Sequence, residues 1–256
     1  MVPDMIKKES GARRLLPAVG QIVVVILVAL LARTVAAEAF YVPSGSMQPT
    51  LLIGDELVVS KFPYGYSRYS VPLALAPSSA ERFLGRMPQR GDVVVFRLPS
   101  DPSQAYVKRV VGLPGDRIRM RGGRLWINDV EMPLRRDGVG EAEDEFGRTL
   151  MAERYVETLP DGREHPIFKL TWDGRYDNTP VYEVTPGHVF VMGDNRDNSA
   201  DSRIAPLSGG VGLVPVENLV GRVEAVLGSW DLGMAEQPIW TWPSGLRLSR
   251  FFSRVE

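Results

Sequence analysis

Pro43-Ser44-Gly45-Ser46-Met47-Gln48-Pro49-Thr50-Leu51 divides the 256-residue chain into two parts of different character. Before it lies an apolar segment, and after it come short β-branched runs bounded by Gly, Pro and Asp. The stretch itself carries two hydroxyls, a permissive glycine and a turn stiffened by proline. It is either a reactive serine beside a membrane or a serine-rich linker between an anchor and a domain, and the rest of the chain has to decide.

The segment before this stretch has the features of a transmembrane helix. Leu15–Ala32 is a run of 18 residues without a charge, which reaches the lower limit for a spanning helix. Arg33 can snorkel to the interface while the apolar length continues. Lys and Arg precede the run and are absent between Glu38 and Ser60, so we predict a cytoplasmic N-terminus over 1–15, one anchor over 16–37, and the remainder outside.

A cleavable signal peptide is the competing interpretation, because Ala37-Glu38-Ala39 has the small-x-small form of a cleavage site. The apolar run exceeds the usual length of about 7 to 15 residues, and Arg33 interrupts the approach to that site. We therefore favour an uncleaved anchor. No second apolar run of comparable length follows in the sequence, so a single span is expected.

From Glu56 onward the pattern is typical of antiparallel β-structure with few helices, because β-branched runs alternate with Gly- and Pro-rich turns. We predict a mainly β fold, with one antiparallel β-sheet domain over 38–127 and 181–256 and an inserted β subdomain with a solvated loop over 128–180. The acidic peak of the insertion is Glu141–Glu145. The predicted strands are Glu56–Ser60, Asp92–Leu98, Tyr106–Val111, Arg117–Met120, Arg124–Ile127, Ile167–Trp172, His188–Met192 and Leu219–Leu227.

Two turns are predicted from their residues. Arg121-Gly122-Gly123 should connect two strands as a hairpin. Leu113-Pro114-Gly115-Asp116 has Pro and Gly where a type II turn needs them, so the strand before it should end sharply.

Composition excludes several kinds of function. The net charge of -1 gives no electrostatic footprint for nucleic acid. The absence of cysteine removes thiol nucleophiles, zinc-thiolate sites and disulfides together. His165 and His188 are the only imidazoles, so a Ser-His-Asp triad would have to use one of them. A serine nucleophile without them needs another base.

Lysine is that base if burial lowers its pKa by several units from about 10.4. Period-2 alternation puts Lys108 on the same face of its strand as Tyr106 and Val110, and Arg109 on the other. An apolar face would lower the pKa of Lys108. An ordinary edge-strand lysine beside a buried, paired Arg109 is equally consistent with the spacing.

A polar loop, Gly193–Arg203, follows the predicted strand His188–Met192. Its short polar side chains predict a loop held by its own hydrogen bonds and by Asp-Arg pairs. An EF-hand calcium loop fails because Arg196, or in the other frame Ser202, stands where a ligand or glycine is required. A generic polar loop is the remaining alternative.

Four stretches follow one another behind the N-terminal apolar segment: Pro43-Ser-Gly-Ser-Met-Gln-Pro-Thr-Leu51, Arg90-Gly-Asp-Val-Val-Val-Phe96, Tyr106-Val-Lys-Arg-Val-Val-Gly-Leu-Pro-Gly-Asp116 and Gly193-Asp-Asn-Arg-Asp-Asn-Ser-Ala-Asp-Ser-Arg203. In this order they resemble the bacterial type I signal peptidases, which are membrane-anchored serine endopeptidases. The resemblance covers residues 38–120 and 185–226.

The resemblance implies roles for individual residues. Ser46 would be the nucleophile and Lys108 the general base. The Ser44 hydroxyl and the Ser46 N–H would form the oxyanion hole. Ser199 would hydrogen-bond and orient the Lys108 amine. The other supporting residues would be Gly193 and Asp194 beneath the site and the pair Asp201 and Arg203.

The same resemblance implies the substrate: a preprotein signal peptide with small residues one and three positions before the cut, bound extended against a strand edge. The matching pocket positions are Phe40, Val42, Pro43, Tyr106 and Val107. The partners would be preprotein signal peptides and the lipid bilayer, and no metal or organic cofactor is implied. The enzyme would sit in the bacterial plasma membrane with its catalytic domain on the outer, periplasmic face.

Two features depart from the family pattern. Ile204–Val211 intervenes before Gly212-Leu213-Val214-Pro215, where the family usually has one or two aromatics, and the chain has one span where some members have two. The tail from Ile239 to Arg254 mixes aromatics with arginines, which fits either interfacial docking on lipid or packing on the domain. A specialised Ser-Lys protease with a dedicated substrate and a catalytically silent peptide-binding domain remain as alternatives.

Overall fold

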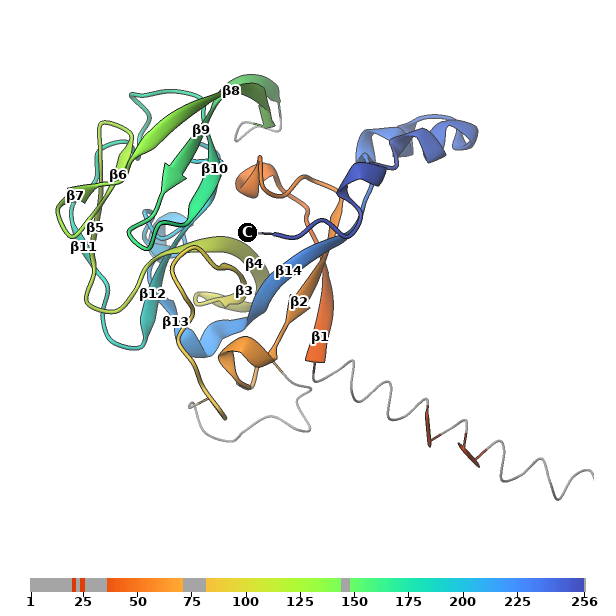
Figure 1. The fold of residues 1–256 in the computed structure, drawn as a ribbon, viewed down its shortest axis with the longest axis horizontal. Coiled ribbons are helices and arrows are strands. Elements are labelled where there is room, and N and C mark those ends of the chain that lie inside the picture. Colours follow the sequence, from red (N-terminus) through yellow and green to blue (C-terminus); the bar gives the residue numbers. More distant parts are fainter. Residues whose placement is uncertain (1–19, 22–23, 26–35, 71–81, 144–147, 256) are drawn as a thin grey trace, which may run out of the picture.

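The fold is described from a computed structural model, which covers residues 20–21, 24–25, 36–70, 82–143 and 148–255 (Figure 1). The predicted anchor lies almost entirely outside these residues. Within the described part of the chain, no helix is long and apolar enough to cross a membrane.

The chain forms antiparallel β-sheets connected by turns and short 3-10 helices, as the sequence predicted. The strands are β1 (Ala37–Tyr41), β2 (Asp55–Ser60), β3 (Val93–Leu98), β4 (Asp101–Gly112), β5 (Arg117–Arg121), β6 (Arg124–Ile127), β7 (Val130–Glu131), β8 (Leu134–Glu143), β9 (Thr149–Thr158), β10 (Glu164–Lys169), β11 (Tyr182–Glu183), β12 (His188–Met192), β13 (Val214–Pro215) and β14 (Leu219–Ser229). The 3-10 helices are η1 (Gly45–Met47), η2 (Phe62–Tyr64), η4 (Pro206–Ser208), η5 (Val216–Asn218), η6 (Leu232–Glu236), η7 (Ile239–Gly245) and η8 (Leu248–Arg250).

The largest sheet has seven strands in the order β1-β2-β14-β3-β4-β12-β13. Its β1 is an edge strand, paired with β2 alone. Its β4 pairs with β3 along most of its length, and β12 pairs only with the end of β4 from Arg109 to Gly112, so the earlier part of β4, up to Lys108, has β3 as its only partner strand. One apolar face of this sheet packs on η1, where Met47 and Leu51 join Val93 and Val95 in a buried cluster.

Both predicted turns are confirmed. The N–H of Asp116 donates to the carbonyl of Leu113 over 3.0 Å, and Gly115 has a φ of 91°, which a type II turn needs. Gly122 and Gly123 have φ values of 54° and 73°, and they join β5 to β6. Positive φ at both central residues is the hairpin geometry that glycine allows.

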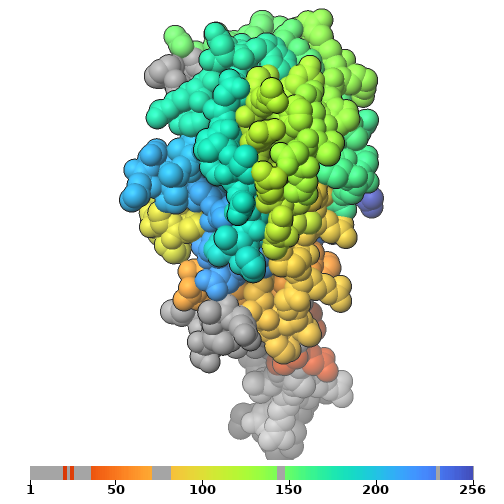
Figure 2. Space-filling view, turned by 90° about the vertical axis from the view of Figure 1, so that its left-hand side faces the viewer, coloured from red at the N-terminus to blue at the C-terminus, as the bar shows by residue number. Residues whose placement is uncertain are grey.

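Two smaller sheets extend the molecule beyond the seven-stranded sheet. One has the order β10-β9-β8, and the other has the order β11-β5-β6-β7. In the space-filling view the green segments of β5 to β9 gather at the upper end, and the yellow and orange segments lie below them (Figure 2). The domain boundaries at 128 and 180 stay a prediction.

The predicted strand Ile167–Trp172 lies about three residues too far along the chain, because β10 ends at Lys169. The Asp197 carboxylate accepts from the N–H groups of Leu170 and Thr171 over 2.7 and 3.1 Å. A side chain from a distant loop therefore takes the donors that a longer strand would have used. Periodicity within the strand cannot show this.

The C-terminal tail packs on the domain. Arg250 binds the buried Asp55 carboxylate and the carbonyl of Thr50, and the N–H of Val226 donates to the carbonyl of Ser253 over 2.9 Å. Trp240 is 79% exposed on the same tail. Packing is thus the observed arrangement, with part of the aromatic surface left in solvent.

Candidate active site

Ser46 lies in η1, the single 3-10 turn that follows β1. It is 8% exposed. Ser44 is the residue before this turn, with extended backbone, and its Oγ lies 3.4 Å from Ser46 Oγ. As the second residue of the turn, Ser46 has no acceptor for its N–H within the helix. Two hydroxyls and a backbone donor therefore meet at one point.

Lys108 reaches this point from β4. Its Nζ donates to Ser46 Oγ over 2.7 Å and to the carbonyl of Val107 over 3.0 Å. Lys108 is 4% exposed and Arg109 is 1% exposed, so Arg109 is buried as the second alternative required, but Lys108 is buried as well and is not an ordinary exposed lysine. Consecutive side chains point to opposite faces of a strand, so both faces of β4 are covered at this position.

Burial lowers the pKa of the Lys108 amine from its usual value of 10.5 to about 8. The negative charges of Asp201 and Asp194 oppose this shift, and the positive charge of Arg203 adds to it. No carboxylate of the described residues comes within salt-bridge distance of Lys108 Nζ. A neutral amine at hydrogen-bond distance from a hydroxyl can accept its proton.

The polar loop holds the backbone on the other side of Ser46. The Asn195 N–H donates to the carbonyl of Ser46 over 3.1 Å, and Asn195 Nδ2 donates to the carbonyl of Gly45 over 3.2 Å. Gly193 lies so close that a Cβ there would stand 2.5 Å from the Ser46 carbonyl oxygen and 2.3 Å from Ser199 Oγ. Only glycine fits this approach.

Asp194 connects the loop to β4 beneath the site. The guanidinium of Arg109 binds its carboxylate through two N–H groups, over 2.9 and 2.8 Å, and Thr50 Oγ1 donates to the same carboxylate. All the charge of this buried pair is matched, and the paired fork geometry is the strong form of this contact. Arg109, the neighbour of Lys108 in the sequence, is thereby bound to Asp194, the neighbour of Asn195.

Asp201 and Arg203 form the expected pair. Arg203 Nε and NH2 donate to Asp201 over 2.9 and 2.8 Å, and the Gly193 N–H donates to Asp201 over 3.0 Å. Burial raises the pKa of Asp201, but Arg203 and these donors outweigh it, and the pKa lies below its usual 3.8. The insertion after Arg203 leaves this pair intact.

The hydrogen bond expected from Ser199 to Lys108 is not formed between these two described residues. Ser199 is 9% exposed, and its hydroxyl lies near Asp201 and helps to lower the pKa of that carboxyl. The physical reason is position, because Ser199 packs directly on Gly193. Lys108 is oriented by Ser46 and by the carbonyl of Val107 instead.

A cavity of about 410 Å³ opens beside Ser46 and Lys108. Four of the five expected pocket positions line it, namely Phe40, Pro43, Tyr106 and Val107. Val42 does not line it, because its side chain is 1% exposed and packs in the core with Met47. The substrate-binding role of Val42 stays a prediction, since the residue packs in the core in this structure.

Other lining residues were not predicted from the sequence. They are Tyr41, Leu57, Val95, Ala105, Asn198 and Ala200. Two of them come from the polar loop and two from the neighbouring strands β2 and β3. Alternation along β3 shows which of its residues share a face with Val95. That this face is also the face of Val107 follows only from the pairing of β3 with β4.

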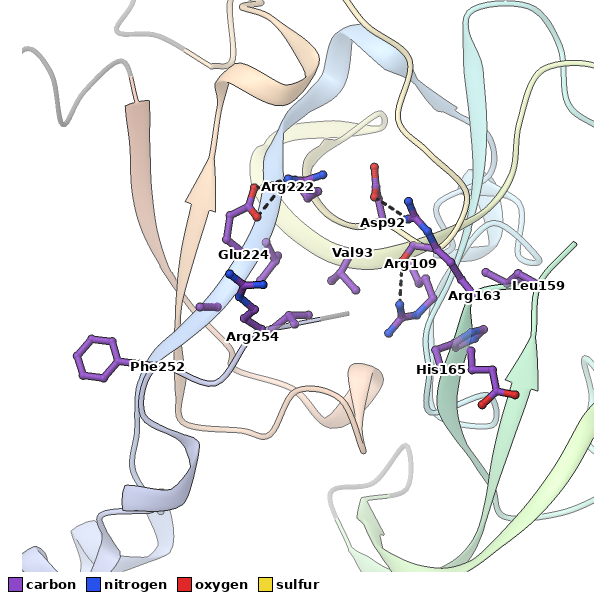
Figure 3. Close-up of a pocket in the computed structure, with 15 residues that line it drawn as sticks. Asp92, Val93, Arg109, Leu159, Arg163, His165, Arg222, Glu224, Phe252 and Arg254 are labelled. Carbon is purple, nitrogen blue, oxygen red and sulfur yellow. Dashed lines mark hydrogen bonds and ion pairs between the residues drawn. The ribbon is translucent and has the colours of Figure 1, made fainter. Parts of the chain in front are cut away.

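A larger cavity of about 880 Å³ lies apart from this site, and neither Ser46 nor Lys108 lines it. Figure 3 shows arginines around it: Arg109 on β4, Arg222 on β14, and Arg163 and Arg254 outside the strands. Arg163 binds Asp92 over 3.2 Å and Arg222 binds Glu224 over 3.0 Å. Residues from both the seven-stranded and the three-stranded sheet line this cavity. Its charged groups include ion pairs, and among the described residues its lining contains no pair of a serine and a lysine.

Comparisons with known proteins identify the family of this chain. Residues 15–230 match the family model described as signal peptidase, peptidase S26. The signal peptidase I of Rickettsia typhi is 38% identical over 247 residues, covering 90% of each chain, and that of Rickettsia massiliae is 38% identical over 252 residues, covering 92% of this chain and 91% of its own.

Among solved structures, a signal peptidase I from Enterococcus faecalis V583 matches 54% of this chain and 97% of its own, with 26% identity and a TM-score of 0.31. The family model and the curated relatives each extend over most of the sequence. The chain belongs to the signal peptidase I family of serine peptidases, peptidase S26.

Proposed function

We propose that this chain removes signal peptides from exported preproteins by hydrolysing the peptide bond after a small-x-small site. Ser46 is the nucleophile and Lys108 the general base. The observation that carries this proposal is the 2.7 Å contact between Lys108 Nζ and Ser46 Oγ, at a buried amine whose pKa is lowered to about 8.

The steps follow from these two groups. The neutral Lys108 amine takes the Ser46 proton as Oγ attacks the scissile carbonyl. The resulting ammonium gives that proton to the leaving amine, and an acyl ester remains on Ser46. Lys108, neutral again, takes a proton from water, whose oxygen attacks the ester. The ammonium then gives that proton to Ser46 Oγ as it leaves, which releases the signal peptide and restores the free serine.

The negative charge on the attacked oxygen needs donors. The Ser44 hydroxyl, 3.4 Å from Ser46 Oγ, and the Ser46 N–H supply them in this proposal. One such donor contributes about 3 to 4 kcal/mol to the barrier. Asp194, Asp201 and their arginine partners keep this arrangement in place, and Gly193 allows the loop to approach.

Substrate selection is assigned to the cavity beside Ser46. Its lining by Phe40, Tyr106 and Val107 is apolar, and at about 410 Å³ it accommodates small side chains. Because β1 is an edge strand, an extended substrate has unpaired backbone groups to bind. Such recognition reads backbone and small side chains, as an Ala-x-Ala site requires.

A membrane anchor over 16–37 completes the proposal. The charge asymmetry of the sequence supports a cytoplasmic N-terminus and a catalytic domain on the outer, periplasmic face of the plasma membrane. The first strand of the described sheet begins at Ala37, the last residue of this segment. The site would then lie on the side where exported preproteins emerge.

Cleavage of a purified preprotein with an Ala-x-Ala site tests the proposal. The full chain is compared with Ser46→Ala, Lys108→Ala and the control Ser103→Ala, a change at an exposed serine. Cleavage by the parent and the control, lost in both folded site variants, supports the Ser-Lys mechanism. Activity that survives in Ser46→Ala contradicts it, and a parent inert on several preproteins favours the dedicated protease or the silent binding domain.

A further inference from the structure

We infer that Glu157, on strand β9 outside the catalytic sheet, is a positioning residue for Ser46, and that it acts through Arg196. This inference rests on the proposed role of Ser46. It extends the catalytic scaffold to the three-stranded sheet β10-β9-β8, which supplies no residue to the cavity beside Ser46.

The contact between Glu157 and Arg196 is buried and has two bonds. Arg196 NH1 and NH2 donate to the two carboxylate oxygens of Glu157 over 2.8 and 2.5 Å, and each residue is 1% exposed. His165 lies beside them, 3.3 Å from Arg196 NH2 through Nε2. Burial holds the pKa of His165 well below its usual value, which favours the neutral imidazole. Glu157 is then the charged partner in contact with Arg196.

Glu157 has little freedom to move. It stands on the central strand of its sheet, opposite Leu134 of β8 and His165 of β10. A side chain on a strand paired at both edges is a fixed point. The fork geometry of the guanidinium transmits that position to Arg196.

The backbone of the polar loop is held by the same sheet. The N–H of Phe168 donates to the carbonyl of Asp194 over 2.9 Å, and the N–H of Arg196 donates to the carbonyl of Phe168 over 3.1 Å. Phe168 thus binds the residues on both sides of Asn195. Arg203 NH2 also donates to the carbonyl of Arg196 over 2.6 Å, so this residue is bound at both its N–H and its carbonyl end.

Asn195 is the residue that carries this position to the nucleophile. It binds the carbonyls of Ser46 and Gly45 through its N–H and Nδ2. The path from Glu157 to Ser46 therefore runs through one side-chain pair, one peptide step and one backbone hydrogen bond. A misplacement of about 1 Å costs roughly 100-fold in rate, so a loosened Arg196 should be visible in the chemical step.

Strand β9 also provides a matched control. Glu153 is four residues earlier, on the same face as Glu157 by strand alternation, but it pairs with Arg136 over 3.3 Å with 39% of its side chain exposed. Among the described residues, the hydrogen bonds and ion pair of its side chain go to Tyr155, Trp172 and Arg136, and none goes to the polar loop. Equal changes at the two positions separate an effect on the sheet from an effect on Ser46.

The experiment compares the full chain with Glu157→Gln, Glu157→Asp, Glu153→Gln and Glu153→Asp. Three quantities are measured: kcat on an Ala-x-Ala preprotein, the rate at which a small activated ester acylates Ser46, and thermal unfolding. The ester needs the geometry of Ser46 and Lys108 but not the peptide cavity. We expect kcat and acylation to fall about tenfold or more in the Glu157 variants and to stay within about twofold in the Glu153 variants.

Folded Glu157 variants that cleave and acylate at the rates of the Glu153 variants would overturn the inference. If Glu157→Gln does not fold, Glu157→Asp, which keeps the charge and shortens the side chain, decides between the two results. Cleavage retained in Ser46→Ala is a different failure, because it overturns the proposed nucleophile itself.

Discussion

Two buried lysines, Lys108 on β4 and Lys169 on β10, show how the same residue serves different ends in two regions of this molecule. Lys169 is 1% exposed, and its Nζ lies 2.6 Å from a carboxylate oxygen of Asp177 and 2.6 Å from one of Asp197. Lys108 is also buried, but its partners are the Ser46 hydroxyl and the Val107 carbonyl.

The difference lies in the counter-charge and not in the burial. Removing an ammonium from water disfavours its charged form, and a carboxylate in contact restores it. Lys169 has two such carboxylates, whereas at Lys108 the nearest negative charges only oppose a shift that burial dominates. At Lys169 two carboxylates balance the ammonium charge, so the residue has a structural role. At Lys108 the partner is a hydroxyl, and the lowered pKa suits a general base.

Arginine substituted at both positions should separate the two roles most strongly. Lys108→Arg is expected to lower kcat/KM on the order of 10⁴-fold, because a guanidinium cannot give up its proton and general-base catalysis is lost. Lys169→Arg keeps the cation between two carboxylates and should remain within about tenfold of the parent. Steady-state cleavage of an Ala-x-Ala preprotein measures both, and equal losses at the two positions would contradict the comparison.

Methionine at Lys169 should damage stability. Lys169→Met leaves Asp177 and Asp197 without their buried cation, which typically costs about 3 to 5 kcal/mol. Urea unfolding at pH 7 measures the change. Arg154→Ala is the control, because the Arg154–Asp137 pair lies at the surface of the neighbouring strand and should contribute less than about 1 kcal/mol. A loss at Lys169 no larger than in this control would rule out the structural role.

Methionine at Lys108 should have the opposite effect on stability. The folded-state pKa of about 8 lies below the usual 10.5, so at pH 7 folding has to bury a charge, at a cost of about 3 kcal/mol. Between these two pH values the unfolded chain binds more protons, and the stability of the parent rises with pH.

Lys108→Met should therefore unfold at higher urea concentration than the parent at pH 7, with the difference shrinking as pH rises toward 10.5. The unfolding midpoint of both proteins, followed from pH 7 to 10, measures this. A Lys108→Met protein less stable than the parent at pH 7 would show that packing at this position outweighs the buried charge.

The pH dependence of cleavage gives the smallest effect. Because Lys108 must be neutral to act, kcat/KM should rise about tenfold per pH unit below about 8 and level off above it. Lys169→Arg should keep the same profile, since Lys169 takes no part in proton transfer. A flat profile between about pH 6 and 10 would exclude lysine as the base.

Much of this could be predicted from local pattern. Eight strands, β2 to β6, β10, β12 and β14, were predicted from alternation, with β10 placed about three residues too late, and both turns follow from Gly and Pro positions. The strands β1, β7, β8, β9, β11 and β13 were not predicted. Ser46, Lys108 and the polar loop stand in recognisable stretches of the sequence.

The contacts predicted within the polar loop are formed, among them the pair of Arg203 with Asp201. The sequence did not predict that Arg196 and Asp197 pair with Glu157 and Lys169 of the neighbouring sheet, because the partners of a buried charge are set by packing.

The amino-acid order alone supplied the chemical groups: a serine in a turn, a lysine on an alternating strand, no cysteine and scarce histidine. The burial of both Lys108 and Arg109, the packing of Val42 in the core and the burial that lowers the pKa of Lys108 were decided in three dimensions. The reason is that desolvation and hydrogen-bond distance belong to pairs of segments, here Ser46 and Lys108, 62 positions apart, and no local pattern contains them.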